Sequence, residues 1–183
     1  MPIYKNDVET DPNNFRPILV LSHFAKVLER LIYNRLKCFL TKNKLISDYQ
    51  FGFRKGYSTV QAMMEITDSL KSNIDNKKIT CGLFLDFSKA FDTVNHEIFL
   101  AKLHKYGVRG TPLTWFTNYL NNRQQYVAIG ITESDCLTMT CGVPQGSTLG
   151  PLLFILYIHD MPNCSNKLSF RIFAERILLK YEY

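Results

Sequence analysis

The longest regular pattern in the chain is an apolar stripe at helical spacing that follows Ser22. Apolar side chains recur every three or four residues from Phe24 to Leu40, and charged residues occupy many of the positions between them. This spacing predicts an amphipathic helix with one buried and one solvated face. The solvated face is expected to carry Lys26 and Glu29. A serine just before the first apolar position is a typical helix start.

Three further helices are predicted by the same kind of pattern. Ser58 can cap a helix whose stripe of Met and Ile residues runs to Ile74, and this stripe is expected to be core. Asn95 begins a helix that Gly107 ends, since glycine is common just past a helix C-terminus. Thr111 is expected to cap the next helix, with a proline at its first helical position.

One apolar run ends abruptly in a carboxylate. Residues 79–85 form a short continuous apolar segment, typical of a buried strand, and Asp86 follows directly. An acid at the end of a strand lies at an edge of the sheet, where ligands collect. Hard cations such as Mg²⁺ bind carboxylate oxygens together with substrate phosphates, so Asp86 is a candidate metal ligand for phosphoryl transfer. Asp92 is a second candidate, with a structural role as its alternative. The plainer alternative is that Asp86 only caps the segment after it.

Further strands are predicted in the second half of the chain. Residues 168–174 and 177–181 have the pattern of two short strands separated by Glu175 and Arg176. Weaker alternation over 125–131 and 136–141 predicts a hairpin that turns at residues 132–135. Helices and strands together indicate a mixed α/β chain.

The composition is that of a folded protein, with 46% hydrophobic and 21% charged residues among 183. The net charge of +6 and the pI near 9.0 are compatible with a polyanionic partner without requiring one. The five cysteines form no C-x-x-C pair, so we expect reduced, mostly buried thiols rather than disulfides or zinc. The chain has no signal sequence and no apolar run that could span a membrane, so it is expected to be intracellular and to make no membrane contact.

Two loops carry the remaining candidate chemistry. Residues 50–59 hold two glycines, two cations and three aromatic residues, a mixture that can neutralise phosphates and stack on bases, although a plain surface loop is the alternative. Residues 142–151 hold three glycines and two prolines around Gln145 and lead into an apolar run, 152–158, that continues as a helix. This second loop lacks the G-K-[ST] ending of a Walker loop, yet its glycines allow close approach of backbone to a ligand.

Taken in order, these segments resemble the reverse transcriptase domain of a non-LTR (LINE-like) retrotransposon. The segments that match, over essentially the whole chain, are 14–18, 26–29 with 35–36, 50–54, 86–92 (motif A) and 142–151 (motif B). The resemblance implies an α/β (α+β) fold, a polymerase fingers and palm fragment with a mainly antiparallel sheet backed by helices. It implies a fingers-like region over 1–78 and a palm region over 79–183, truncated after motif C and without a thumb.

The resemblance also implies roles for residues at matching positions. Catalytic and metal-binding roles fall on Asp86 and Glu175. Nucleotide-binding roles fall on Lys5, Arg16, Phe91, Gln145 and Gly146, with Phe91 gating the sugar, and nucleic-acid-binding roles fall on Gln50, Arg54, Lys55 and Pro144. The implied cofactor is Mg²⁺ (or Mn²⁺). The implied partners are an RNA template, a DNA primer and deoxynucleoside triphosphates, and no obligate protein partner is evident.

Motif C departs from the family pattern. The family has Phe-Ala-Asp-Asp in a tight hairpin, whereas residues 173–176 are Phe-Ala-Glu-Arg. The longer Glu175 side chain displaces its oxygens from the octahedral geometry that Mg²⁺ demands, and Arg176 adds a permanent positive charge where two cations must be clamped. An arginine that points away would soften this effect. Alternatively, residues 175–183 are unrelated sequence joined by a frameshift or a splice.

The function expected from the resemblance is therefore that of a reverse transcriptase domain, with two-metal nucleotidyl transfer in the family and no activity in this fragment. Two alternatives stay open. One is a non-catalytic remnant that still binds nucleic acid, which a steep salt dependence of binding would support. The other is the non-functional product of a decayed element.

Overall fold

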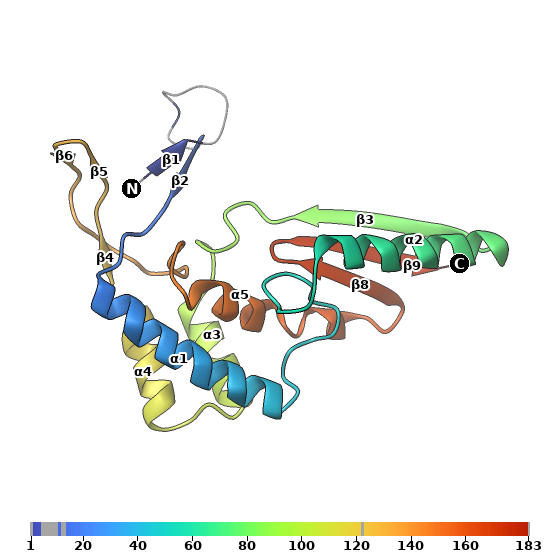
Figure 1. Ribbon diagram of the computed structural model, residues 1–183, viewed down its shortest axis with the longest axis horizontal. Helices are drawn as coiled ribbons and strands as arrows, with labels where there is room; N and C mark the ends of the chain where they lie inside the picture. The colour runs from blue at the N-terminus through green and yellow to red at the C-terminus, as the bar shows by residue number, and fades with distance from the viewer. Residues whose placement is uncertain (1, 5–10, 12–13, 122, 183) are drawn as a thin grey trace. The chain divides into compact units, whose positions relative to one another are not determined.

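The computed structural model describes residues 2–4, 11, 14–121 and 123–182 (Figure 1). The chain forms two compact units, each built from two separate segments. Unit 1 comprises Met1–Leu36 and Phe91–Leu153, and unit 2 comprises Lys37–Ala90 and Phe154–Tyr183. Each unit therefore draws residues from both sides of the boundary expected at residue 78. The assignment of 1–78 to fingers and 79–183 to palm remains a prediction.

Unit 1 is mainly helical. Its helices are the first part of α1 (His23–Lys42), then α3 (His96–Lys105), α4 (Thr111–Leu120) and the start of α5 (Gly150–Ile158). Its strands form short antiparallel pairs: β1 (Pro2–Tyr4) with β2 (Phe15–Pro17), β4 (Gln124–Gln125) with β7 (Leu137–Thr138), and β5 (Ala128–Ile129) with β6 (Thr132–Glu133). The buried apolar side chains of α3 and α4 are Phe99, Leu103, Phe116 and Leu120.

Helix ends in unit 1 follow the capping signals in the sequence. Ser22 Oγ accepts a hydrogen bond from the Ala25 N–H at 3.2 Å, and Asn95 Oδ1 accepts one from the Ile98 N–H at 3.0 Å. Each bond satisfies an N–H that has no partner within its own helix. After α3, Gly107 adopts a φ of 95°, the left-handed conformation that terminates helices. These predicted boundaries are confirmed.

Two predicted boundaries in unit 1 are wrong by a few residues. Helix α4 has Gly110, not Thr111, as its N-cap, and no side chain caps it. The hairpin turns at Gly130 and Ile131, between β5 and β6, and not at residues 132–135. The φ of Gly130 is 61°, and a tight two-residue turn needs such a positive value at its first central position.

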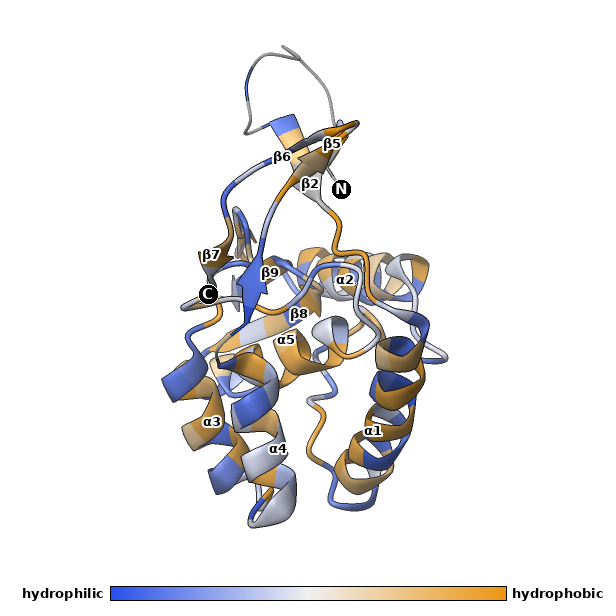
Figure 2. Cartoon of the chain, turned by 90° about the vertical axis from the view of Figure 1, so that its left-hand side faces the viewer, coloured by the Kyte–Doolittle hydropathy of each residue, from blue (hydrophilic) through white to orange (hydrophobic). Residues whose placement is uncertain are grey.

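Helix α1 forms where expected, but its buried side differs from the pattern. Phe24 is 89% exposed, and Val27 and Leu31 are also exposed, whereas Glu29 is only 3% exposed. Buried apolar side chains on this helix begin at Leu36. Figure 2 shows hydrophobic and hydrophilic residues alternating along α1. Glu29 can be buried because two hydrogen-bond donors meet its carboxylate inside unit 1, which offsets the loss of water.

Unit 2 contains a three-stranded antiparallel sheet with strand order β3-β9-β8, together with α2 (Figure 1). The elements are α2 (Thr59–Asp75), β3 (Thr80–Asp86), β8 (Leu168–Phe173) and β9 (Arg176–Glu182), with a short 3₁₀ helix, Met161–Cys164, before β8. Ser58 caps α2 by accepting the Gln61 N–H at 3.2 Å, as predicted. The antiparallel sheet with an accompanying helix confirms the expected fold class.

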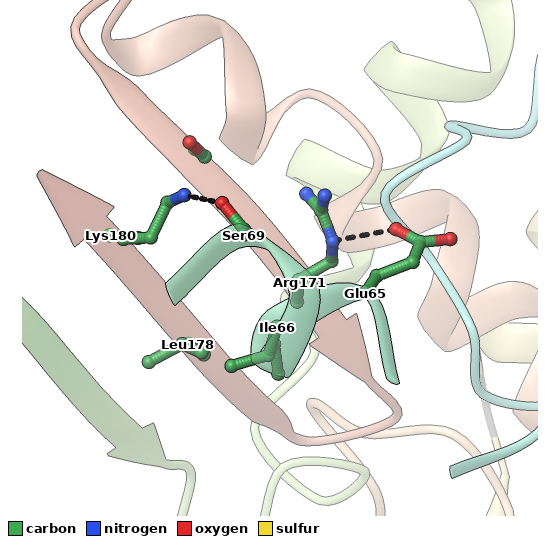
Figure 3. Close-up of a pocket in the computed structure, with 7 residues that line it drawn as sticks. Glu65, Ile66, Ser69, Arg171, Leu178 and Lys180 are labelled. Atoms are coloured by element: carbon green, nitrogen blue, oxygen red, sulfur yellow. Dashed lines mark hydrogen bonds and ion pairs between the residues drawn. The ribbon is translucent and has the colours of Figure 1, made fainter. Parts of the chain in front are cut away.

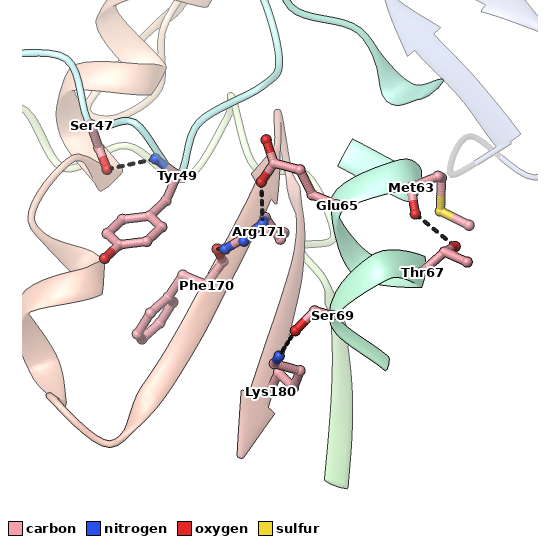
Figure 4. A network of polar contacts seen from close by, with 9 residues as sticks. All are labelled: Ser47, Tyr49, Met63, Glu65, Thr67, Ser69, Phe170, Arg171 and Lys180. Atoms are coloured by element: carbon pink, nitrogen blue, oxygen red, sulfur yellow. Dashed lines mark hydrogen bonds and ion pairs between the residues drawn. The ribbon is translucent and has the colours of Figure 1, made fainter. Parts of the chain in front are cut away.

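Polar contacts attach α2 to two strands of this sheet. Arg171 on β8 lies 2.9 Å from Glu65 of α2, measured from Nε to Oε2, and Lys180 on β9 donates to Ser69 Oγ. Leu178 lines the same small hollow as the residues of these two contacts (Figure 3). Figure 4 shows the same pairs spaced along the helix. The residues of α2 that meet the sheet are therefore partly polar.

Two apolar surfaces in unit 2 that were expected to be core are exposed. On α2 the stripe through Met63 and Ile74 is exposed rather than buried. On β3, expected to be a buried strand, Phe84 is 79% exposed. Strand β3 pairs only with β9 among the described strands, so it is an edge strand. The short apolar run predicted the strand correctly but not its burial.

Two further expectations concern the burial of the cysteines and helices that could cross a membrane. All five cysteines are free, as expected, but all five are exposed, so the prediction of mostly buried thiols is wrong. In the described part of the chain, no helix has both the length and the apolar character needed to cross a membrane.

Candidate functional site

The turn between β8 and β9, residues 173–176 (the motif C turn), carries Glu175, one of the two candidate metal ligands of unit 2. Ala174 adopts a φ of 55°, which allows the tight reversal. Strand β3 pairs with β9 so that Asp86 lies opposite Arg176. The Phe87 N–H donates to the carbonyl oxygen of Glu175 at 3.1 Å. The structure thus brings Asp86 and Glu175 to the same end of the sheet.

Arg176 points toward Asp86 and not away from it. Its Nε lies 3.7 Å from Asp86 Oδ1, and the two side chains are 75% and 71% exposed. An exposed ion pair of this kind contributes at most about 1 kcal/mol to stability. The alternative in which the arginine turns away from the candidate ligand is therefore wrong for this structure.

The loop after α1 is anchored to the motif C turn through a buried glutamine. Gln50 is 2% exposed, and its Oε1 accepts the Gly52 N–H at 2.8 Å and the Ala174 N–H at 3.3 Å. The Phe51 N–H donates to the carbonyl oxygen of Ile172 at 2.7 Å. We expected Gln50 at a surface that contacts nucleic acid. The structure instead places its side chain inside, because two backbone donors need its oxygen.

Arg54 is also used within this loop. Its Nη1 donates to the carbonyl oxygens of Ser47 at 2.7 Å and Gln50 at 3.1 Å, and its guanidinium lies 4.0 Å from the centre of the Tyr57 ring. These contacts fix the loop conformation and leave little of the side chain for a ligand. Lys55, by contrast, is exposed. Of the predicted contacts in this loop, Lys55 is the one best placed to meet a phosphate.

In unit 1 the loop of residues 142–149 (the motif B loop) is bonded through its backbone to the end of motif A and to the segment that follows it. The Val143 N–H donates to the carbonyl oxygen of Phe91, and the Gly142 N–H donates to that of Val94, both at 2.7 Å. Two short backbone bonds in sequence resemble a strand pairing. They hold Phe91, the predicted sugar gate, in a fixed relation to motif B.

Position 142 requires a glycine because the motif B loop lies very close to the backbone of Asp92 here. The φ of Gly142 is 90°, and a Cβ at this position would lie 2.9 Å from the carbonyl oxygen of Asp92, closer than such atoms tolerate. His96, buried on α3, places Nε2 2.7 Å from the Gly142 carbonyl oxygen. Because a carbonyl can only accept, Nε2 carries the proton.

Gln145 and Gly146, both predicted to bind nucleotide, lie next to the segment that follows β2. Gln145 Nε2 is 3.1 and 3.2 Å from the two carboxylate oxygens of Asp92, and its backbone oxygen accepts the Leu19 N–H at 3.0 Å. Gly146 has a φ of 87°, and a Cβ there would meet Ile18 Cγ2 at 3.1 Å. The structure thus brings these two residues together with Asp92, whose role beside Gln145 the sequence did not predict.

Glu29 is a second residue that the sequence reasoning missed. Its Oε1 accepts the Tyr119 O–H at 2.6 Å, and its Oε2 accepts the Thr148 N–H at 2.8 Å. Burial, together with the hydrogen bond and the negative charge of Glu29, raises the pKa of Tyr119 well above its ordinary value. Glu29 therefore connects α1, α4 and the motif B loop. Its position within the matching segment 26–29 was the one signal that could have pointed to it.

A serine closes the motif B loop onto α5. Ser147 Oγ donates to the carbonyl oxygen of Pro144 at 2.8 Å and accepts the Gly150 N–H at 2.8 Å. The carbonyl of Pro144, a predicted nucleic-acid contact, is therefore used within the loop. The proline itself is half-buried.

The remaining predicted residues are less fully described. Lys5 lies outside the described residues. Arg16 lies in β2 opposite Ile3, and its side chain is not described. Phe91, Pro144, Gln145 and Gly146 belong to unit 1, whereas Gln50, Arg54, Lys55, Asp86 and Glu175 belong to unit 2.

Comparison with known proteins identifies the family. A family model described as reverse transcriptase (RNA-dependent DNA polymerase) matches residues 3–180. The chain belongs to this family. It is 38% identical over 164 residues to a probable RNA-directed DNA polymerase from transposon BS of Drosophila melanogaster, covering 86% of this chain and 17% of that protein. It is 34% identical over 180 residues to the corresponding protein from transposon X-element of the same fly, covering 94% and 19%.

A third relative is the Pol polyprotein of the type-1 retrotransposable element R1 of Bradysia coprophila, 31% identical over 84% of this chain and 15% of that protein. These relatives confirm the resemblance to the reverse transcriptase domain of a non-LTR retrotransposon. The chain spans less than a fifth of the length of each of these three proteins.

Solved structures with a similar fold include apo telomerase from Candida tropicalis. The TM-score is 0.63 at 9% identity, covering 84% of this chain and 31% of that one. A form of the same enzyme truncated from its C-terminal domain gives 0.58 at 11% identity, covering 85% and 34%. At such low identity the likeness concerns the fold alone, and it agrees with a polymerase fingers and palm fragment.

Reverse transcriptases as a family use divalent metal ions, which converging carboxylates hold. We tested whether the residues present here fit such a centre. Over residues 2–4, 11, 14–121 and 123–182, no three side chains of His, Cys, Asp or Glu gather as a metal site. Moreover, a guanidinium faces Asp86. The donor set therefore does not fit a two-metal centre.

Proposed function

We propose that this chain is the nucleotide- and template-holding part of a retrotransposon reverse transcriptase, and that the free chain binds nucleic acid without extending a primer. The observation that carries this proposal is the contact between Asp86 and Arg176, 3.7 Å apart at the end of the sheet. Nucleotidyl transfer needs negative charge at this point to hold cations against the triphosphate. A guanidinium that is always protonated supplies the opposite charge.

The holding part of the site supports the binding half of the proposal. The motif B loop is bonded to the end of motif A, to the segment that follows it and to Leu19, so the backbone around Gln145 and Gly146 is fixed before any ligand arrives. The net charge of +6 favours a polyanion, and Lys55 is exposed in the loop of unit 2. The proposed ligands are an RNA template, a DNA primer and deoxynucleoside triphosphates.

Roles in the site follow the matched motifs. Asp86 and Glu175 occupy the positions of the family's metal ligands. Because the donor set does not fit a two-metal centre, the proposed site holds a single Mg²⁺ or Mn²⁺ ion, which has to displace Arg176 from Asp86. Lys5 and Arg16 are proposed to face the triphosphate, and Phe91 to gate the sugar. In this proposal Gln50 and Arg54 act by shaping the loop that presents Lys55.

Primer-extension assays test the first claim of the proposal, that the free chain does not extend a primer. Incorporation of labelled nucleotide on a homopolymer RNA template, with Mg²⁺ or with Mn²⁺, is expected to be absent for the unmodified chain. Clear incorporation would contradict our interpretation of Glu175 and Arg176. The double variant Glu175→Asp with Arg176→Asp then shows whether the motif C turn is the sole cause. Incorporation by the double variant locates the defect there, and its absence means that more than this turn is missing.

RNA-binding measurements test the second claim of the proposal, that the free chain binds nucleic acid. Lys55→Ala is expected to weaken binding and to reduce the slope of log K against log salt by about one, the change for one lost phosphate contact. Arg30→Ala on α1 is the matched control, since it removes an exposed cation outside the matched loops. Equal effects of both variants would show that charge alone drives binding. An unmodified chain that does not bind RNA at all would favour the decayed-element alternative.

A further inference from the structure

The contact between Gln145 and Asp92 fixes the orientation of the glutamine amide. Nε2 lies 3.1 and 3.2 Å from the two carboxylate oxygens. An ionised carboxylate only accepts hydrogen bonds, whereas a glutamine amide has a donating nitrogen and an accepting oxygen. The nitrogen must therefore face Asp92, because the opposite orientation would bring the amide oxygen against two oxygens.

Both partners of this contact are held by their backbones. Asp92 lies between Phe91 and Val94, whose carbonyl oxygens accept the N–H groups of Val143 and Gly142 at 2.7 Å. Gln145 is held through its own backbone oxygen by the Leu19 N–H at 3.0 Å. Both side chains are half-buried and belong to unit 1. The fold therefore fixes the positions of both Asp92 and Gln145.

With the nitrogen directed at Asp92, the amide oxygen is the group that Gln145 can offer to a ligand. Within the described residues, Oε1 of Gln145 makes no hydrogen bond. We propose that Asp92 is a positioning residue that turns the Gln145 amide so that an acceptor faces the bound nucleotide. The ligand group at this point is then a hydrogen-bond donor, a sugar hydroxyl or a base N–H, and not a phosphate oxygen. This inference rests on the proposed function, which supplies the nucleotide as ligand.

Substitutions at the two positions make distinct predictions. Asp92→Asn introduces an amide that can donate to Gln145 Oε1, so the glutamine loses its fixed orientation. Gln145→Glu places two carboxylates about 3 Å apart, where like charges repel. In the double variant, the amide at position 92 donates to one oxygen of the carboxylate at position 145. The second oxygen then faces outward as an acceptor. Each single variant should therefore lose nucleotide affinity, and the double variant should regain it.

The orientation itself can be tested without any ligand. In the full chain, the side-chain amide NMR signals of Gln145 are expected to change in Asp92→Asn, because the amide nitrogen loses its carboxylate acceptor. Asp135→Asn, which changes an exposed carboxylate of the same unit, is the matched control and should leave these signals unchanged. Gln145 signals that do not respond to Asp92→Asn would overturn the proposal.

The ligand is tested by titrating a deoxynucleoside triphosphate, its 2′,3′-dideoxy analogue and inorganic triphosphate. Each single variant is expected to weaken binding of the deoxynucleotide about tenfold, with recovery in the double variant. A weaker dideoxy analogue identifies the sugar hydroxyl as donor, and equal affinity identifies a base N–H. Triphosphate alone shifting the Gln145 signals would overturn the donor assignment.

One further outcome separates this inference from the proposed function. If the unmodified chain binds RNA but no nucleotide changes the Gln145 signals, the ligand assignment is wrong while the RNA-binding function stands. If the unmodified chain does not bind RNA, the proposed function itself fails. In that case the effect of Asp92→Asn on the Gln145 amide signals still decides the role of Asp92.

Discussion

The motif B loop of unit 1 and the motif C turn of unit 2 are held in different ways. The loop is fixed by short backbone bonds, by two glycines at positive φ, and by the buried carboxylate of Glu29. At the turn, the contact between the substituted side chains and Asp86 is one exposed ion pair. Motif B keeps its family sequence, and motif C does not.

This difference shows which positions the fold itself constrains. A buried donor or acceptor that loses its partner costs about 1–3 kcal/mol, a large share of the stability of a small domain. Loss of an exposed ion pair changes the free energy of unfolding by close to nothing. Substitutions at Glu175 and Arg176 can therefore remove the family chemistry without unfolding the chain. Changes that remove the buried contacts of the motif B loop would instead lower the free energy of unfolding.

Gly142→Ala should produce the largest effect. A Cβ at this position meets the backbone of Asp92 at 2.9 Å, and the φ of 90° is strained for any residue but glycine. We expect a loss of about 3 kcal/mol in the free energy of unfolding. The single tryptophan, Trp115, lies in unit 1 and reports its unfolding in urea by fluorescence.

The control for this variant is Gly130→Ala, at a φ of 61° with no atom within 4 Å of the added Cβ. It keeps the backbone strain and removes the clash, so the expected loss is only about 1 kcal/mol. Equal losses in both variants would mean that the close approach to Asp92 contributes nothing.

Glu29→Ala should have the next largest effect. It leaves the Tyr119 O–H and the Thr148 N–H without their acceptor, at an expected cost of about 2–3 kcal/mol by tryptophan fluorescence in urea. Lys26→Ala, which changes an exposed side chain one turn earlier on α1, should change stability by less than about 0.5 kcal/mol. Similar losses from both changes would contradict the structural role of Glu29.

A pH effect should follow from Tyr119. Its pKa is raised in the folded state, chiefly by burial, so the unfolded chain releases this proton first as the pH rises. Stability should then fall above about pH 10, by up to about 1.4 kcal/mol per pH unit for one proton. The measurement is the difference in the free energy of unfolding between the unmodified chain and Tyr119→Phe, followed in urea from about pH 8 to about 11. This difference separates the contribution of Tyr119 from that of the other titrating groups. A constant difference would refute the prediction.

Arg176→Ala should have the smallest effect on stability, a change of less than about 0.5 kcal/mol, because its ion pair with Asp86 is exposed. Far-UV circular dichroism of urea unfolding reports the whole chain, including unit 2, which lacks a tryptophan. The same variant should bind Mn²⁺ more tightly than the unmodified chain, since Asp86 loses its competing cation. A large loss of stability would show that Arg176 is part of the fold.

The sequence by itself determined the helices, the motif C strands and the family. Helical spacing and capping residues are local, because a helix satisfies its hydrogen bonds within one segment. For the same reason Ser22, Ser58 and Asn95 marked helix starts correctly. The motifs identified the family because residues that meet a ligand recur in a fixed order along the chain.

Only the tertiary structure decided which side chains are buried and what the polar ones contact. Glu29 and Gln50 have the sequence character of surface residues, yet both are buried because donors from distant segments meet their oxygens. Asp92 acquires its role from Gln145, 53 residues away. Strand β3 has the composition of a buried strand and is nevertheless exposed at a sheet edge. Burial and pairing depend on partners that local sequence does not specify, since each arises from a long-range contact.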